Sequence, residues 1–451
     1  MSTELKYSRR KFFKKLALSG LIFSGITGRT SNQKTKKWIK TKHWDIIVVG
    51  GGPGGIPASV AAARNGARVL LVERYGFLGG MATSALVHPF MKYKAGETVL
   101  TRGLFEEFVN RLIANQAMLA DRQHFDSEPM KWLLDRFVLD SQVDLLLHTQ
   151  AVGVLRERKK IKAVRIFHKG GFEDISAEIF IDSTGDGDLA AWSGAIVEIG
   201  REGDHQCQPM TLNFRMANVD INAMPTGSEI NRLFDEAKAR GEVTNPRENV
   251  LKFLTVHPDV IHFNTTRVIG KSVLDGWEFT EAEIEGRRQV TEMVGFLKKY
   301  VKGFENSYLM QMGTQIGVRE SRRVIGKYVL TADDVLSARH FNDGIACASY
   351  PIDIHNPTGT GTDIRQLKEG TYYTIPYRCL LPVGVDNLLI ASRCISATHE
   401  AHSSLRIMPV VWSIGEAAGT AASLCLKSQI TPTELEAAQL RQKLLQQGAF
   451  V

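Results

Sequence analysis

The sequence predicts an α/β fold into which a second, α+β segment is inserted, and three observations support this prediction. A strand, a glycine turn, a helix and a second strand follow one another at residues 45–73. From about residue 201 to 340 the chain alternates between amphipathic helical patterns and short strand-like runs. Loops rich in glycine and proline, a strand and a small-residue helix then return at residues 341–430. We therefore expect one domain assembled from an early and a late segment, with the middle segment inserted.

The glycine turn carries the clearest functional signal. Residues 50–55 read GGGPGG, between an apolar run at 46–49 and an alanine-rich helix, and the second apolar run ends at Glu73. Gly50 suits a tight turn, Gly52 lets backbone N–H groups approach a pyrophosphate, and Gly55 lets the helix pack closely on the strand. The phosphates would bind at the helix N-terminus, and an acid at this spacing suits a ribose diol. We predict a dinucleotide site here, formed by Gly50, Gly52, Pro53, Gly54, Gly55 and Glu73. The alternative is a glycine turn that binds no nucleotide.

Net charge argues against a nucleic-acid partner. The chain of 451 residues carries a formal charge of +8, but 12 of its 56 Lys/Arg residues lie within residues 1–43, together with one acid, Glu4. Residues 44–451 therefore carry a net charge of −3. The basic character belongs to the N-terminal segment, so it does not indicate a polyanion partner for the folded body.

That N-terminal segment resembles a twin-arginine export signal. Residues 8–14 read SRRKFFK, and a weakly apolar stretch follows at residues 16–26. The stretch is shorter than the roughly 20 residues that span a bilayer, so no stable membrane span is predicted. We expect residues 1–43 to be a signal and linker that direct export to the periplasm or another extracytoplasmic space. A basic N-terminus without a targeting role is the alternative.

Cysteine spacing excludes the common metal and cluster motifs. The five cysteines include no CxxC pair, so neither an iron–sulfur cluster nor a zinc site is predicted, and we expect no metal. There is also no second strand–GxGxxG–helix unit, and a separate nicotinamide domain is therefore not expected.

Four segments together resemble one protein family. They are the GGGPGG unit with Glu73, STGDGDLA at 183–190, GVRESRRVIGKYVLTADDV at 317–335, and the run at 387–422 that contains SRCISATHEAHSSLRIMP. They are similar to the FAD-dependent oxidoreductase family whose flavin domain is related to the flavoprotein module of heterodisulfide reductase. YPIDIH at 350–355 and YYTIPYRCLLP at 372–382 fit the same resemblance. This chain departs from it in lacking cysteine-rich cluster motifs, and in having Ser392-Arg393 where many related flavoproteins have Gly-Asp.

The resemblance implies a Rossmann-like three-layer FAD-binding domain and assigns further cofactor residues. It divides the chain into 1–43 (signal and linker), 44–200 and 341–430 (FAD-binding domain), 201–340 (substrate or cap domain) and 431–451 (C-terminal helix). Arg74 would flank the adenine, and the backbone of Val152 would meet the adenine edge. Arg393 stands at the ribityl chain, and Arg406 precedes a helix whose N-terminus would stabilise negative charge on the reduced flavin. The remaining expected contacts are Gly79, Gly80, Met81 and Thr83 near the ribityl chain and flavin ring, and Thr184, Gly185 and Asp186 on the adenosine side.

Catalytic candidates come from the returning segment and from an arginine cluster. A flavin dehydrogenase usually needs a base for the substrate proton, and His355 and His399 are our candidates, with His402 as a weaker third. Arg319, with Glu320, Arg322 and Arg323, would bind an anionic or polyhydroxylated substrate, or would form a structural ion-pair network. Weaker candidates are Tyr377 and Arg378, which would line the pocket, and His88, which would carry a covalent flavin bond.

Together these features predict an exported FAD-dependent oxidoreductase. It would move a hydride from a small polar substrate, either carbohydrate-derived or a hydroxy acid, to FAD, and an electron acceptor not identified by the sequence would reoxidise it. One alternative is a flavin-dependent monooxygenase or reductase of the same fold. Another is a non-catalytic FAD protein that transfers electrons within a complex, although a cap over the site argues against it.

Replacing Arg9 and Arg10 together by lysine is expected to block export, because the twin-arginine route requires the arginine pair rather than positive charge alone. Fractionation of an expressing bacterium should then find the protein in the cytoplasm. Exchange of Lys36 and Lys37 for arginine, outside the motif, is the charge-matched control and should not change export. Unchanged export of the R9K/R10K variant would contradict the signal.

Overall fold

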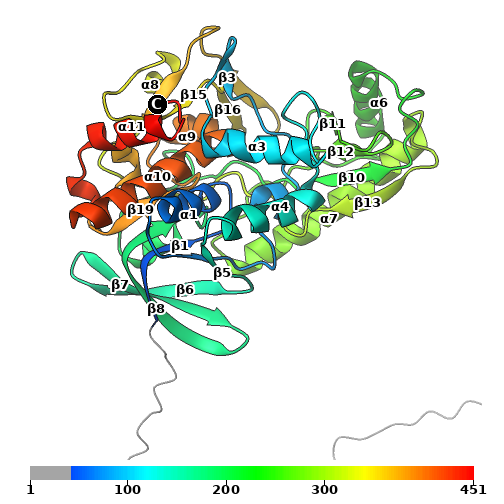
Figure 1. Cartoon of the computed structure of the whole chain (residues 1–451). Helices are drawn as coiled ribbons and strands as arrows, with labels where there is room; N and C mark the ends of the chain where they lie inside the picture. The colour runs from blue at the N-terminus through cyan, green and yellow to red at the C-terminus, as the bar shows by residue number, and fades with distance from the viewer. Residues whose placement is uncertain (1–41) are drawn as a thin grey trace, which may run out of the picture. The chain divides into compact units, whose positions relative to one another are not determined.

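A computed structural model of the protein describes residues 42–451 (Figure 1). The predicted twin-arginine motif at residues 8–14 and the apolar stretch at 16–26 lie outside the described residues. Within residues 42–451, no helix is both long enough and apolar enough to cross a membrane.

A parallel sheet forms the centre of the FAD-binding domain predicted from the sequence. Its strands run in the order β5-β2-β1-β8-β19, with every neighbouring pair parallel. Ile46 of β1 lies opposite Val69 of β2 on one side and Ile179 of β8 on the other. Ile46, Val69 and Ile179 are all buried, as expected for a parallel sheet covered on both faces. The strands are β1 (Lys42–Val49), β2 (Val69–Val72), β5 (Asp144–Leu146), β8 (Gly171–Asp182) and β19 (Leu388–Ile390).

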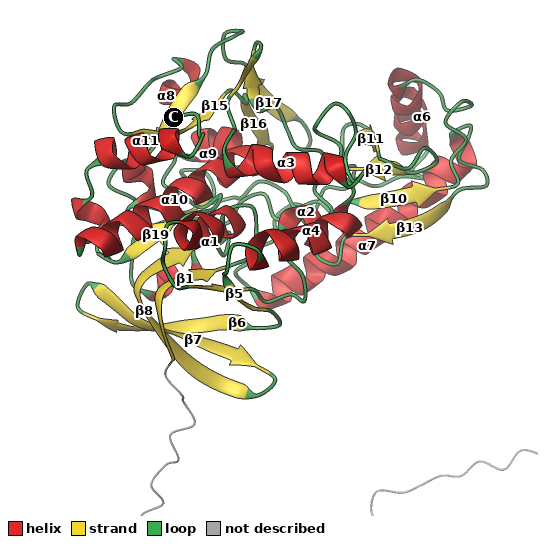
Figure 2. Ribbon diagram, in the orientation of Figure 1, coloured by secondary structure: helices red, strands yellow, loops and turns green. Residues whose placement is uncertain are grey.

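Helices cover one face of this sheet, and an antiparallel meander lies on the other side (Figure 2). The meander consists of β6 (Gln150–Glu157), β7 (Lys160–His168) and the first part of β8, which continues into the parallel sheet. The predicted α/β class with a parallel sheet is thus confirmed, and the layers are helix, sheet and meander. The helices are α1 (Gly55–Arg64), α4 (Ser127–Leu139) and α10 (Met408–Ser428), with α3 (Leu104–Ala114) packed against them.

The inserted segment forms a sheet and a hydrophobic core of its own. Its antiparallel strands run in the order β11-β12-β10-β13, and its core extends from Met210 to Val318. Val324, Leu330 and Val335 pack instead in the core of the FAD-binding domain. The second core therefore ends near residue 318, whereas the sequence placed the boundary at 340. The elements are β10 (Phe214–Ala217), β11 (Lys252–Leu254), β12 (Ile261–Phe263), β13 (Tyr308–Met312), α6 (Gly227–Ala239) and α7 (Gly276–Tyr300).

A short ladder joins the two ends of the insert. β9 (Val197–Ile199), just before it, pairs antiparallel with β14 (Arg322–Val324), just after it. The chain thus enters and leaves the insert at neighbouring points. The remaining elements are β3 (Lys94–Ala95), β4 (Thr98–Val99), β15 (Gly344–Ala348), β16 (Ile352–His355), β17 (Thr362–Arg365), β18 (Tyr373–Pro376), α2 (Met81–Ser84), α5 (Asp188–Trp192), α8 (Ala332–Leu336), α9 (His399–Leu405) and α11 (Ala437–Gln446), with 3₁₀ turns at Tyr377–Leu380 and Pro432–Glu434.

Helices α1 and α10 pack backbone against backbone. A Cβ atom on Gly415 would lie 2.1 Å from the carbonyl oxygen of Gly54, and one on Gly419 would lie 2.0 Å from that of Ala58. Neither distance is compatible with a side chain, because the obstacle is backbone and cannot rotate away. The small-residue surface predicted for the late helix is therefore the surface that contacts α1.

Gly419→Ala is expected to lower the free energy of unfolding by about 1–3 kcal/mol, because the added methyl group overlaps the Ala58 carbonyl. The matched control is Gly295→Ala in α7, where a Cβ meets nothing within 4 Å. There, alanine should leave stability unchanged or raise it by about 0.5–1 kcal/mol. Chemical denaturation of the two variants measures the difference, and equal stabilities would contradict the close contact.

Candidate active site

A cavity of about 520 Å³ lies at the carboxyl ends of the parallel strands. Val49 and Gly50 line it after β1, Glu73 after β2, and Ser183 after β8. Open α/β sheets bind ligands at this edge. Residues of the insert, among them Thr211, line the same cavity, so both parts of the chain contribute to one site.

The glycine turn forms a cradle suited to a pyrophosphate. Gly50 has φ +103°, and a Cβ on it would lie 2.3 Å from the Ser183 carbonyl oxygen, so only glycine fits. A Cβ on Gly52 would meet nothing closer than 3.7 Å, because that side of Gly52 faces the cavity. Pro53 and Gly54 also line the cavity, and no side chain caps the N-terminus of α1 that follows them. Gly55 begins α1 behind this wall, and its Cβ would strike the Gly50 carbonyl at 1.8 Å. An uncapped helix N-terminus behind an open glycine turn fits an anionic diphosphate.

Glu73 has two roles in this wall. It lines the cavity where a ribose was expected, and its carboxylate also accepts hydrogen bonds from the Gly51 N–H (2.6 Å) and the Tyr75 N–H (2.9 Å). Burial raises the pKa of Glu73, and the two backbone N–H groups oppose that rise. Glu73 therefore holds the glycine turn in place as well as facing the cavity. Arg74 lines the cavity beside it, donates to Gln315 (2.5 Å) and lies over the Tyr75 ring.

On the adenosine side, the structure places some expected residues in the cavity wall and others behind it. Thr184 and Gly185 line the cavity, whereas Asp186 is not among the lining residues and instead pairs with Arg393 at 2.6 Å. Val152 does not line the cavity either, and its side chain is exposed on the meander. The lining positions are residues 149–151, because the N–H of Thr149 binds the Glu73 carbonyl and brings the start of β6 to the site.

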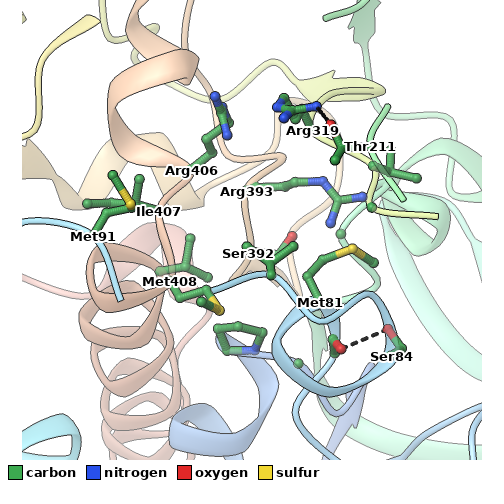
Figure 3. Close-up of a pocket in the computed structure, with 18 of the residues that line it drawn as sticks. Met81, Ser84, Met91, Thr211, Arg319, Ser392, Arg393, Arg406, Ile407 and Met408 are labelled. Atoms are coloured by element: carbon green, nitrogen blue, oxygen red, sulfur yellow. Dashed lines mark hydrogen bonds between the residues drawn. The ribbon is translucent and has the colours of Figure 1, made fainter. Parts of the chain in front are cut away.

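Helix α10 begins at the side of the cavity where the flavin ring is expected. Ile407 and Met408 line it, and no side chain caps α10. Figure 3 shows Met408 and Met81 on one side of the pocket, with Arg393, Arg406 and Ser392 also facing it. An uncapped helix N-terminus with nearby guanidinium groups fits the anionic edge of a reduced flavin ring. Gly80 lines the cavity as well, whereas Gly79 and Thr83 lie behind it; Gly79 donates its N–H to Gly51 and Thr83 its hydroxyl to Leu78.

A group of charged side chains lines another part of the same cavity, here termed the chamber. Arg319 and Arg406 reach it from different segments (Figure 3), and Arg247 and Glu248 enter from a loop of the insert. Asp353 lines the same chamber, and its Oδ2 accepts a hydrogen bond from the hydroxyl of Tyr350 at 2.9 Å.

His355 lies in this chamber, and its hydrogen bonds define its tautomer. Its Nδ1 lies 3.3 Å from both Arg247 Nη1 and Arg267 Nη2. Guanidinium groups only donate, so Nδ1 accepts and the proton of the neutral ring is on Nε2, which faces Asp353 Oδ1 at 3.8 Å. Burial, and then the surrounding arginines, lower the pKa of His355 well below its usual value. The geometry thus makes His355 a hydrogen-bond donor to the chamber, whereas the sequence had assigned it as a base.

The other histidine candidates and the neighbours of Arg319 do not line the cavity. His399 Nδ1 is 2.9 Å from Glu320 Oε1, which also accepts from Arg323 at 2.6 Å. Arg322 pairs with Asp188 at 2.8 Å. The sequence cluster at 319–323 is therefore divided: Arg319 faces the cavity, and the others form the structural ion-pair network that was the alternative interpretation. His402, Tyr377 and Arg378 are likewise not among the lining residues.

His88 lines the cavity but is packed as part of an aromatic cluster. Its Nε2 lies 3.2 Å from the Leu254 carbonyl, and its ring contacts those of Phe125 and His262. Burial lowers the pKa of His88 to about 3. Within residues 42–451, no group of His, Cys, Asp and Glu side chains is arranged to hold a metal ion.

Sequence reasoning missed several residues of the chamber. Arg247 and Glu248 lie in the loop NPREN at 245–249, which has no recognisable motif. Tyr350 and Asp353 belong to YPIDIH, a segment that the family resemblance had singled out without giving these side chains a role. The alternation of Asp353 and His355 with the isoleucines of β16 was the available signal, because alternate residues of a strand face the same side.

The fold and this site define a flavoprotein: a parallel sheet, a glycine turn and two uncapped helix N-termini at one cavity. Residues 45–444 match the model of the family described as FAD dependent oxidoreductase, and the chain belongs to that family. The predicted FAD cofactor and oxidoreductase class are confirmed by this match.

Individual relatives are more distant. The digeranylgeranylglycerophospholipid reductase of Thermoplasma volcanium is 25% identical over 199 residues, which cover 40% of this chain and 48% of that protein. This match thus spans about half the length of the relative. The dihydrolipoyl dehydrogenase of Dictyostelium discoideum is 43% identical over 54 residues, 12% of this chain and 11% of the relative. A geranylgeranyl bacteriochlorophyll reductase-like structure from Thermoplasma acidophilum superposes with a TM-score of 0.45 and 13% identity, over 91% of this chain and 85% of the other.

Gly52→Ala is expected to weaken FAD binding by about tenfold or more without disturbing the fold. The added methyl group has room in the protein but occupies the open side of the cradle, where a phosphate would approach the backbone. Flavin fluorescence titration of the apoprotein measures the affinity, and circular dichroism reports the fold. Gly153→Ala, where a Cβ also meets nothing within 4 Å, is the control away from the cavity. Equal FAD affinity of both variants would contradict the assigned cradle.

Proposed function

We propose that the protein is an exported FAD-dependent dehydrogenase or oxidase that takes a hydride from a small polar substrate, either a carbohydrate-derived alcohol or a hydroxy acid. The observation that supports this proposal most directly is that one cavity contains both the cofactor cradle and a chamber lined by Arg319, Arg406 and Asp353. Export rests on the N-terminal SRRKFFK motif and on the short, weakly apolar stretch at residues 16–26 that follows it. The resemblance to the flavoprotein module of heterodisulfide reductase belongs to this proposal as well, without its cluster cysteines.

In this proposal FAD supplies the hydride acceptor, and the chain supplies the proton acceptor and the charge stabilisation. As the C–H hydride leaves the substrate carbon, the hydroxyl proton passes to Asp353 and a carbonyl group forms. Asp353 is suited to this role because it lines the cavity, and the Tyr350 hydroxyl at 2.9 Å orients its carboxylate. The uncapped start of α10 and Arg406 balance the negative charge that arrives on the cofactor side.

The charged chamber also distinguishes the alternatives. A flavin-dependent reductase has one supporting observation, the reductase names of the relatives that match about 200 residues of the chain. Such a reaction would need an external hydride donor such as a nicotinamide. A non-catalytic electron-transfer protein has no use for buried arginines and an oriented carboxylate beside the cofactor, so we do not favour it.

Anaerobic mixing of the FAD-loaded protein with sugars, sugar acids and hydroxy acids is expected to bleach the flavin absorbance with at least one of them. Asp353→Asn should keep FAD but slow that bleaching by about 10²–10⁴-fold, because it removes the proton acceptor. Asp204→Asn, at an exposed surface pair with Arg201, is the matched control and should react at the normal rate. Bleaching by NADPH but by none of these substrates would contradict the proposal and favour the reductase.

A further inference from the structure

We propose that Arg319, Arg247 and Arg406 form a carboxylate-binding subsite, so that the substrate is an acid rather than a neutral alcohol. This inference rests on the proposed function, since it assigns the substrate class of the same chamber. It follows from the balance of charge, from hydrogen-bond donors without partners, and from the position of the arginines beside Asp353.

Positive charge exceeds negative charge around the chamber. Four guanidinium groups surround His355, but only two carboxylates, Glu248 and Asp353, face them among the described residues. Glu248 is engaged by Arg267 at 2.9 Å, and Asp353 lies 3.9 Å from Arg406. The four guanidinium groups thus outnumber the two carboxylates that lie beside them. The four arginines are Arg247, Arg267, Arg319 and Arg406.

Arg319 is the clearest member of the subsite. Within residues 42–451 its guanidinium donates only to neutral oxygens: the Pro209 carbonyl at 2.6 Å, the Thr211 hydroxyl and the Asn264 amide oxygen at 3.4 Å. Arg319 is partly buried in the cavity wall, and desolvation together with Arg406 lowers its pKa well below the ordinary value. A partly buried charge without a counter-ion is unfavourable, because it loses water contacts that no opposite charge replaces.

Two arginines close to Arg319 in the sequence or in the cavity wall have carboxylate partners at short distance, whereas the buried Arg215 lies 3.9 Å from Asp126. Arg323 pairs with Glu320 at 2.6 Å, and Arg393 pairs with Asp186 at 2.6 Å. Arg319 differs from Arg323 by only four positions, yet it faces the cavity and not the ion-pair network. Arg319 therefore has no nearby carboxylate among the described residues because it faces the cavity, where a ligand would bind.

Donors in the chamber also lack acceptors. Arg406 Nε is buried and has no hydrogen-bond partner in the described part of the chain, and its Nη2 makes only long hydrogen bonds, to the Asp353 carbonyl at 3.4 Å and to Gln208 Oε1 at 3.5 Å. Arg247 is almost fully buried and directs one nitrogen to His355 and another to Asn249 at 3.3 Å, with the cavity beside it. A carboxylate only accepts hydrogen bonds and carries the missing charge, so it satisfies both deficits together.

The subsite adjoins the proposed proton acceptor. Arg406 Nη2 lies 3.9 Å from Asp353 Oδ2, so an acid held by the arginines would have its neighbouring carbons close to that carboxylate. A hydroxyl-bearing carbon near the acid group would then be the one oxidised. The chemical class is a small hydroxy acid or sugar acid, held through its carboxylate.

Equilibrium binding tests the subsite without depending on turnover. Malonate, glycerate and glucuronate, each added to the FAD-loaded protein under anaerobic conditions, are expected to perturb the flavin spectrum or to bleach it. The neutral analogues malonamide, glycerol and glucose should bind at least about 30-fold more weakly, because they cannot pair with the guanidinium groups.

Arg319→Gln should weaken binding of the tightest of these acids by about 30-fold or more and leave binding of its neutral analogue unchanged, with partial rescue by Arg319→Lys. Arg378→Gln, which removes a surface pair with Asp343, is the matched arginine control and should bind the acid normally. Retained FAD absorbance shows that each variant is folded.

The outcomes separate the two proposals. Acid binding that depends on Arg319 without any bleaching would keep the subsite and overturn the dehydrogenase function. Bleaching by a neutral alcohol as readily as by its acid would keep the function and overturn the subsite. Failure of all three acids to bind at millimolar concentration, or acid binding unaffected by Arg319→Gln, would also overturn the subsite.

Discussion

The backbone contact between α1 and α10 is the constraint on which the rest of the site depends. Two helices from opposite ends of the chain approach so closely that the Gly54 carbonyl occupies the place where a side chain of Gly415 would be. Neither helix has a side-chain cap, and both begin at the cavity. The contact therefore positions two sets of free N–H groups at a fixed separation, one suited to a diphosphate and one to the anionic edge of a flavin. A bulkier residue in either helix would separate the two ends of the cofactor site.

The electrostatics of the cavity change along its length. Helix N-termini and open glycines dominate at the cofactor cradle, whereas the chamber uses full charges contributed by separate segments: Arg247 from the insert, Arg319 from its far end, and Arg406 from the end of α9. Helix termini provide partial charges that need no counter-ion when a ligand is absent, but buried guanidinium groups do need one. This contrast explains why the chamber, rather than the cradle, indicates the charge of the substrate: its arginines need an anionic partner.

Local and distant interactions explain which features the sequence could predict. The glycine turn, Glu73 and the small-residue helix are determined within short segments, and their backbone requirements are visible in the residues themselves. The chamber depends on tertiary contacts: Arg247 and Arg319 are 72 positions apart, and nothing local distinguishes Arg319, which faces the cavity, from Arg323, which pairs with Glu320. The tautomer of His355 similarly follows from two arginines brought to it by the insert. Residues 149–151, and not Val152, line the cavity, because a Thr149–Glu73 backbone hydrogen bond fixes the start of β6 there, and this tertiary contact has no local signal in the sequence.

The β9–β14 ladder has a consequence for how such proteins diversify. The insert begins and ends on two strands that pair with each other. The two ends of any inserted segment therefore need to be only one strand spacing apart, whatever the number of residues between them. Closure entropy rises slowly with loop length, and the insert has a core of its own, so its size and sequence can vary with little penalty to the flavin domain. The ladder is thus a natural point for recombination: exchange of the segment between β9 and β14 would replace Arg247 and Arg319, two arginines of the proposed carboxylate subsite, while Arg406 and the cofactor cradle stayed in place.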